Sequence, residues 1–188
     1  MIFNIKLETP RLLLRGFNQQ SYHDLFAQYT QPQIMEILGV YTQEEYDLEL
    51  SRYNGGYSTY NLTIQFFQLV TKEDDRIIGW CGFHSWAQQH RRAEVFYLLK
   101  NEIDKQKGIM SEALKAVIDY GQNEMNLRRI EAFVATNNLA SQRLLEKNNF
   151  IKEATLQHRY LFGDDVEWDY LFSLVIVGSA HMEDTKDK

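Results

Sequence analysis

The residues with the clearest chemical potential lie in the stretch DKQKGIMSEAL, residues 104–114, where Lys105 and Lys107 flank Gly108 just before an apolar helical pattern begins. The start of a helix leaves several backbone N–H groups unpaired and carries about half a positive charge, so it can bind an anion. Glycine lets the backbone approach a phosphate closely, and the lysines add positive charge. The stretch therefore predicts a pyrophosphate site. An ordinary surface loop stays open as an alternative, because neither GxxxxGK[ST] nor GxGxxG occurs.

A second candidate is Glu94, which lies upstream in a β-rich run. Along a strand it shares a face with Phe96 and Leu98, and apolar surroundings of this kind raise the pKa of a carboxylate, which suits a general base. A solvated glutamate at the start of a strand is the alternative, and the sequence supports both. Three further side chains have acid–base chemistry but a simpler structural interpretation: His84, Tyr97 and Tyr160.

Hydrophobic periodicity predicts the elements that must position these residues. Alternating or continuous β-rich runs between turn residues indicate strands, and apolar residues at steps of three and four indicate helices. The polar turn at 72–76 makes a hairpin of the two strands that flank it. The predicted strands are residues 10–17, 63–70, 77–86, 92–99, 128–135, 150–157 and 166–175. The predicted helices begin at Ser21, after Thr42 and after Gly108, and a short one spans residues 139–147.

Capping residues support the helix boundaries. Thr42 followed by Glu45 has the spacing of a capping box. Asn137 and Asn138 are both favourable N-cap residues for the short helix that follows them. Asn149 tolerates the left-handed backbone that often ends a helix, so we expect it to close the same helix.

The order of these elements predicts an α/β (α+β) fold in one domain. An antiparallel meander comes first, and alternating strands and helices follow, which gives a mixed, mostly antiparallel central sheet of about seven strands with helices on both faces. The unit from 92 to 135 predicts two parallel strands joined by a right-handed crossover helix. Ligands in such sheets gather at the carboxyl ends of parallel strands, and residues 104–114 lie there.

Composition narrows the class of protein. With 188 residues, of which 44% are hydrophobic, the chain can bury one core, so we expect one domain over residues 1–177 and a polar, disordered tail over 178–188. The net charge of −6 argues against a nucleic-acid partner. No apolar run is long enough to span a membrane and the N-terminus lacks a signal-peptide pattern, so we expect a cytoplasmic protein.

Cysteine, histidine and acidic residues add further expectations. The single cysteine, Cys81, lies in an apolar run and is expected to be a buried thiol. The five histidines lack zinc-site spacing, so we expect no metal. Acidic residues cluster at 44–49 and 164–169, either as solvated segments or as a rim that attracts a cationic partner.

Several motifs taken together resemble one enzyme family. AEVFYLL, KGIMSEALKAVIDYG, LRRIEAFVATNNLASQRLLEKNNFIKE, GDDVEWDY and the early TPRLLLR resemble, in order and spacing, the GCN5-related N-acetyltransferases (GNAT), and within them the ribosomal-protein N-acetyltransferases. The resemblance covers about residues 7–175. It implies a parallel strand pair that is splayed where acetyl-CoA binds, and transfer of the acetyl group to an amine-bearing acceptor without a metal.

The resemblance also implies site residues. The family's pyrophosphate pattern falls on Lys105, Gln106, Lys107, Gly108, Ile109 and Met110. Lys105 and Met110 depart from it, since the family has Gln or Arg at the first position and a small residue at the last, and the loop before Gly108 is one residue longer. Further cofactor contacts are implied for the backbone N–H groups of Leu98 and Leu99, where the family's strand bulges, for Asn138 at the pantetheine arm and for Arg143 near the adenine.

The implied mechanism is direct attack of a neutral amine on the thioester. Glu94 is the implied base, acting through a water, and Ser141 is a hydrogen-bond partner of the departing sulfur. Many family members have a tyrosine acid where this chain has Leu145. Two other hypotheses stay open: a catalytically silent CoA-binding sensor or scaffold, and a phosphate-loop protein for another nucleotide. The acceptor is also open between a protein N-terminal α-amine and small amines, and so is a homodimer.

Overall fold

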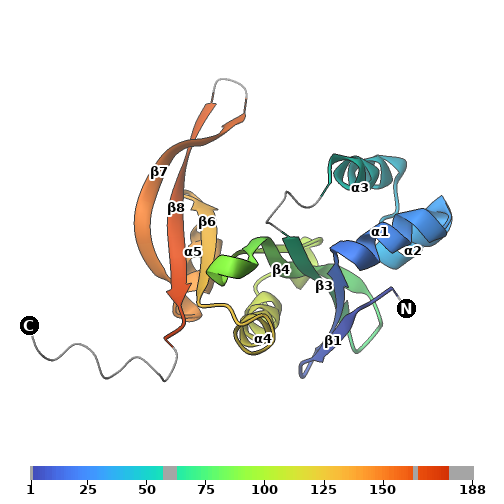
Figure 1. Cartoon of the computed structure of the whole chain (residues 1–188), viewed down its shortest axis with the longest axis horizontal. Helices are drawn as coiled ribbons and strands as arrows, with labels where there is room; N and C mark the ends of the chain where they lie inside the picture. The colour runs from blue at the N-terminus through green and yellow to red at the C-terminus, as the bar shows by residue number, and fades with distance from the viewer. Residues whose placement is uncertain (1, 57–62, 163–164, 178–188) are drawn as a thin grey trace, which may run out of the picture.

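The computed structural model describes residues 2–56, 63–162 and 165–177 (Figure 1), and for 158–162 and 165–167 it describes the backbone alone. Its helices are α1 (Gln19–Gln28), α2 (Gln31–Leu38), α3 (Gln43–Gly55), α4 (Ile109–Asn123) and α5 (Leu139–Lys147), with short 3-10 turns η1 (Gln88–His90) and η2 (Glu102–Asp104). Its strands are β1 (Ile5–Glu8), β2 (Leu12–Asn18), β3 (Thr63–Thr71), β4 (Ile77–Ala87), β5 (Arg92–Leu99), β6 (Arg129–Ala135), β7 (Ile151–Phe162) and β8 (Asp165–Val175).

The strands form one sheet in the order β1-β2-β3-β4-β5-β6-β8-β7. Every neighbouring pair is antiparallel except β5 and β6, which run parallel. The predicted mixed, mostly antiparallel sheet is confirmed, with eight strands in place of about seven. The additional strand is β1, whose four residues are too few for a sequence pattern and are held by antiparallel pairing with β2.

The parallel pair is short, and this opens the sheet in the middle. β5 and β6 are paired only from Arg92 opposite Arg129 to Glu94 opposite Glu131. Beyond Glu94, β5 runs on to Leu99 without a β6 partner. The two strands therefore part toward their carboxyl ends, which is the splayed geometry that the resemblance implies.

Helices cover both faces of the sheet, as predicted (Figure 1). The main core lies between one face and helices α4 and α5, and it contains Leu114, Val117 and Leu145, all fully buried. A second core lies on the other face, where Leu25 of α1 and Leu38 of α2 are buried. Because α4 packs on the face opposite α1 and α2, the side chains of β5 alternate between two different environments.

The predicted helix boundaries hold with one correction. Thr42 and Glu45 form the expected capping box at the start of α3. α1, however, begins at Gln19 rather than at Ser21, because Asn18 is the N-cap and its side-chain oxygen accepts the Ser21 backbone N–H at 2.9 Å. Ser21 completes that cap from within the first turn. Asn149 adopts the left-handed conformation expected after α5, with φ of 65°.

Helix α2 is an element that the sequence analysis did not predict. It is short, and Pro32 in its first turn and the left-handed Gly39 at its C-cap are its start and stop signals. None of the helices in the described part of the chain is long and apolar enough to cross a lipid bilayer. The predicted tail, residues 178–188, lies outside the described residues, so the domain boundary at 177 stays a prediction.

Candidate active site

The predicted phosphate-binding stretch leads into the start of α4. Gly108 is the N-cap residue, with φ of 72° and ψ of 6°, and among the described residues no side chain caps this helix. The first intrahelical bond runs from Glu112 N to Gly108 O at 3.1 Å, so the N–H groups of Ile109, Met110 and Ser111 precede the ladder. A Cβ added to Gly108 would have a single described neighbour within 4 Å, an Arg11 nitrogen at 3.8 Å. The backbone is therefore open to an anion.

Side chains of the same loop divide into exposed and packed groups. Lys107 and Gln106 are exposed, and Gln106 is left-handed with φ of 59°. The Lys105 ammonium contacts the Glu102 carboxylate. Ile109 is buried and Met110 packs against the main core. The side chains of these two residues therefore point into the protein, and only their backbone N–H groups are available to a ligand at the loop.

An ion pair between Arg11 and Glu112, which are far apart in the sequence, fixes this loop. Glu112, in the first turn of α4, accepts hydrogen bonds from the Thr9 hydroxyl at 2.6 Å and from Arg11 Nε at 2.7 Å. Arg11 also donates to the carbonyl of Lys107 at 2.9 Å. Burial opposes ionisation of Glu112, but these hydrogen bonds hold its pKa below the usual value. Arg11 thus adds a guanidinium beside Gly108, a role that no sequence pattern around residue 11 indicates.

The loop before Gly108 contains the 3-10 turn η2. Asp104 ends that turn with its side chain almost fully buried, and its Oδ1 lies 3.4 Å from the guanidinium of Arg76. Arg76 comes from the turn between β3 and β4. Asp104 therefore folds inward at the end of η2, and the residues that follow it up to Gly108 are exposed.

The strand that precedes the loop approaches β4 closely at Leu98. The β4–β5 register is continuous from Gly79 opposite Leu99 to His84 opposite Glu94, so the expected bulge at Leu98 and Leu99 is not a register shift with β4. A Cβ added to Gly79 would lie 2.1 Å from the Leu98 carbonyl oxygen, so this carbonyl occupies the space that a side chain at position 79 would need. Only glycine permits so close an approach of the two backbones.

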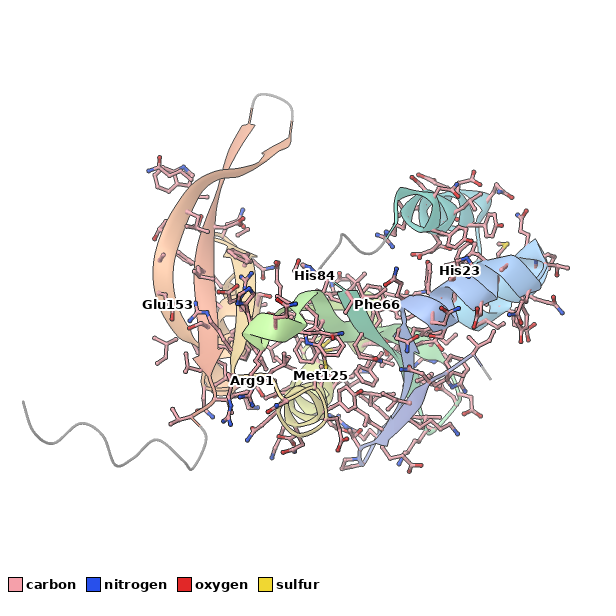
Figure 2. All side chains as sticks on the ribbon, in the orientation of Figure 1. His23, Phe66, His84, Arg91, Met125 and Glu153 are labelled. Carbon is pink, nitrogen blue, oxygen red and sulfur yellow. The ribbon has the colours of Figure 1, made fainter. Side chains whose placement is uncertain are left out.

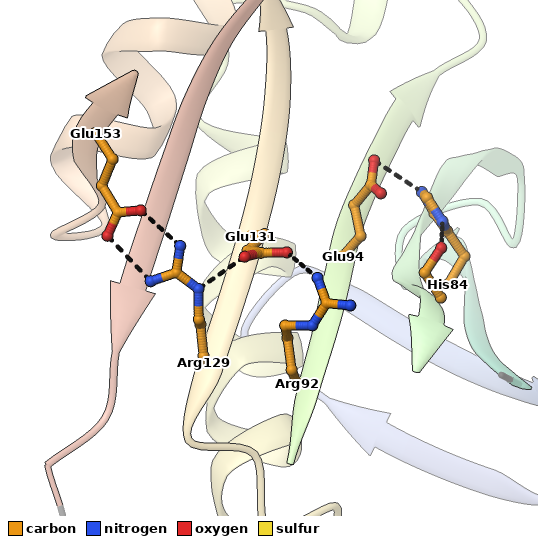
Figure 3. A network of polar contacts seen from close by, with 7 residues as sticks. His84, Arg92, Glu94, Arg129, Glu131 and Glu153 are labelled. Carbon is orange, nitrogen blue, oxygen red and sulfur yellow. Dashed lines mark hydrogen bonds and ion pairs between the residues drawn. The ribbon is translucent and has the colours of Figure 1, made fainter. Parts of the chain in front are cut away.

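Glu94 lies at the last paired position before β5 and β6 part. Its side chain is 14% exposed and its Oε1 lies 3.4 Å from His84 Nε2 (Figure 3). The other ring nitrogen of His84 is 3.0 Å from the Ser85 hydroxyl. Figure 2 places His84 and Phe66 on the side of the sheet away from α4, and both rings contact Phe96. Glu94 and His84 therefore lie beside the aromatic rings of Phe66 and Phe96 on this face.

A chain of ion pairs crosses the neighbouring strands on the same side (Figure 3). Glu131, which is buried, accepts from Arg92 at 2.6 Å and from Arg129 at 2.7 Å. Arg129 also pairs with Glu153, and together with a hydrogen bond from Ser173 it lowers the pKa of Glu153 to about 2. The two arginines thus compensate the negative charge of Glu131, which is directly opposite Glu94. This allows the carboxylates of Glu94 and Glu131 to lie side by side on this face.

On the α4 side of the sheet, Tyr97 and Ser141 meet. The Tyr97 hydroxyl lies 2.8 Å from Ser141 Oγ, and burial raises the pKa of Tyr97 to about 12. Ser141 stands in the first turn of α5, where its backbone N–H donates to the capping oxygen of Asn138 at 3.1 Å. Arg143 is exposed on the same helix, and Leu145 is buried.

The structure thus brings the predicted residues into two groups around the splayed strands. Glu94 and His84 occupy one face, and Tyr97 and Ser141 the other. Side chains of Tyr160 and of residues 164–167 lie outside the described part. A hollow of about 590 Å³ lies at the other end of α4, lined by Tyr120 and Glu124, and is separate from both groups. Within the described residues, no three His, Cys, Asp or Glu side chains gather as metal ligands.

Comparisons with known proteins agree with this architecture. Residues 11–151 match the Acetyltransferase (GNAT) domain. YoaA of Bacillus subtilis, an uncharacterized N-acetyltransferase, is 33% identical over 87% of this chain and 92% of its own length. The ribosomal-protein-serine acetyltransferase of Escherichia coli is 29% identical over 57% of this chain and 59% of its own. A dodecameric spermidine N-acetyltransferase of Vibrio cholerae shares the fold, with a TM-score of 0.63 at 19% identity over 89% of this chain and 95% of its own. The chain belongs to the GNAT family of acetyltransferases.

Proposed function

We propose that this enzyme transfers an acetyl group from acetyl-CoA to a primary amine by direct attack, with no covalent enzyme intermediate. The observation that carries the proposal is the opening between β5 and β6, which has Glu94 at its closed end and the uncapped start of α4 at its open end. A thioester that lies along β5 would have its pyrophosphate near Gly108 and its acetyl group near Glu94.

The residues at the start of α4 fit a diphosphate. Three backbone N–H groups precede the helical ladder, Gly108 has no Cβ to block them, and Lys107 is exposed beside them. Arg11 holds the Lys107 carbonyl and adds positive charge. In this proposal Gln106, Lys105, Ile109 and Met110 border the phosphates. Leu98, Leu99, Asn138 and Arg143 hold the rest of the cofactor.

Glu94 is the proposed base. Attack on a thioester requires a neutral amine, and a carboxylate that takes the amine proton through a water supplies it. Glu94 contacts His84, whose ring lies against Phe96 on the same face of the sheet, and this is the face on which we place the acceptor. On the opposite side, the Ser141 hydroxyl is the proposed partner of the departing sulfur.

An N-terminal α-amine is the first acceptor class to test, because its pKa of about 7.7 to 8.0 leaves roughly a fifth of it neutral near pH 7.2, whereas lysine near 10.4 is almost wholly charged. A relative in Escherichia coli is named for a ribosomal protein, and a fold neighbour for spermidine. Exposed Glu44 and Asp47 on α3 and the net charge of −6 suit either cationic acceptor.

The test is release of free thiol from acetyl-CoA in the presence of a panel of peptides with free N-termini, polyamines, aminoglycosides and small amino compounds, with products identified by mass spectrometry. Amine-dependent release is the expected result. Binding of acetyl-CoA without release by any amine would favour a CoA-binding sensor. A thermal shift with ATP or NAD but not with acetyl-CoA would overturn the cofactor assignment.

A further inference from the structure

We propose that Tyr97 is a positioning residue, which donates its hydroxyl hydrogen to Ser141 and thereby directs the Ser141 hydroxyl toward the sulfur of coenzyme A. The inference rests on the proposed function, since it concerns the sulfur end of the same site. It is carried by the 2.8 Å contact between the two hydroxyl oxygens, one from β5 and one from α5.

The direction of this hydrogen bond follows from chemistry. Each hydroxyl can donate once and accept, and a phenol is the more acidic of the two, so Tyr97 is the better donor. When Tyr97 donates, the Ser141 hydrogen is released for another acceptor. In the reverse arrangement Ser141 would donate its hydrogen to the Tyr97 oxygen, and a lone pair of the Ser141 oxygen would face the sulfur.

Packing fixes both oxygens before any ligand arrives. Tyr97 is partly buried against the main core, opposite the fully buried Cys81 in the sheet register. Ser141 is held by its backbone N–H on the Asn138 cap. Two anchored oxygens at hydrogen-bond distance leave the serine hydroxyl few orientations, which is the condition for a preorganised donor.

Tyr97 is not itself the proton donor to the sulfur. Burial raises its pKa to about 12, whereas a free thiol has a pKa near 8.5, so proton transfer from Tyr97 to the thiolate is unfavourable by roughly three orders of magnitude. Orientation of a hydrogen bond needs no such transfer. The pair thus stabilises the charge that develops on sulfur while both protons stay on oxygen.

The experiment is a double-mutant cycle read by calorimetry, with coenzyme A and with desulfo-coenzyme A, which lacks the thiol. Tyr97→Phe and Ser141→Ala should each weaken binding of coenzyme A by about two- to tenfold and leave desulfo-coenzyme A unaffected. The double variant should match Ser141→Ala alone. Tyr120→Phe, another partly buried tyrosine on the main core, is the matched control and should bind both ligands like wild type.

Three outcomes would overturn the inference: Tyr97→Phe keeps full discrimination between the two ligands, it weakens both equally, or its effect persists when Ser141 is absent. Ser141→Thr keeps a hydroxyl, so it should restore discrimination only while Tyr97 is present.

Because the cycle needs no acceptor, a wild-type protein that discriminates the ligands but acetylates no amine would contradict the proposed function and leave the Tyr97 role supported. Failure of wild type to bind either ligand would overturn both.

Discussion

Replacement of Gly108 separates backbone strain from ligand binding. The residue has φ of 72°, a conformation that costs an L-amino acid about 1 to 2 kcal/mol. In a chain of this size each kcal/mol shifts the melting temperature by about 2 to 4 °C, so Gly108→Ala should melt about 2 to 8 °C below wild type. Gly108→Asn should lose less, because asparagine tolerates this conformation.

Binding should respond differently from stability. The added Cβ meets no described atom closer than Arg11 Nη2 at 3.8 Å, so it would project into open space rather than into the protein. If a phosphate occupies that space, overpacking costs about 1 to 3 kcal/mol, which is a rise in Kd of roughly five- to 150-fold. Both the alanine and the asparagine variants should show it, although they differ in melting temperature.

The assay is calorimetric titration with coenzyme A, together with thermal unfolding followed by circular dichroism. Gly56→Ala is the matched control, since Gly56 also has positive φ, of 76°, has no atom of the described residues within 4 Å of an added Cβ, and lies at the end of α3. It should lower the melting temperature and leave Kd unchanged. Wild-type affinity in either Gly108 variant would refute the placement of the phosphate.

Three further changes have defined outcomes. Glu94→Gln should leave coenzyme A affinity intact, lower turnover about a hundredfold or more and alter the acidic side of the pH–rate profile; an unchanged profile would remove Glu94 from the mechanism. Glu112→Gln should cost about 1 to 3 kcal/mol at pH 7, because Thr9 and Arg11 lose a charged acceptor. Since the folded-state pKa of Glu112 lies below the usual 4.5, its ionised form stabilises the fold above that pH, and the difference from wild type should shrink as the pH falls further; a constant difference in melting temperature would contradict this. Cys81 is fully buried with a raised pKa, so it should resist a thiol reagent until the protein is unfolded, and rapid native reaction would show that β4 opens.

Local patterns were sufficient for several elements that bury one face. The strand over 92–99 and the helix over 139–147 have the predicted bounds. The helix after Gly108 begins as expected, because its apolar residues repeat at helical steps over the whole length of α4. Hydrophobic periodicity predicts these elements because each one buries a single face, and the apolar residues on that face repeat at the period of the helix or strand.

Patterns failed where neighbours in space define an element. β1 has four residues and exists through its pairing with β2, so no period could be read from it. α2 has eight residues, and its start signals at Thr30 and Pro32 also fit a turn. The helix expected to begin at Ser21 begins two residues earlier at Gln19, because Asn18 and Ser21 are both residue types that favour a helix start and Asn18 is the one that caps it.

The sequence by itself determined the fold class and the family, and the residues proposed for the site came from motifs within segments. Those residue roles stay predictions. Only the tertiary structure decided which side chains meet: Arg11 at the Lys107 carbonyl, Glu94 at His84, and Tyr97 at Ser141. The physical reason is that periodicity arises from neighbours within one element. Contacts between hydroxyl, carboxylate and guanidinium groups on separate elements depend on how the sheet, α4 and α5 pack together, and that packing leaves no repeat in the chain.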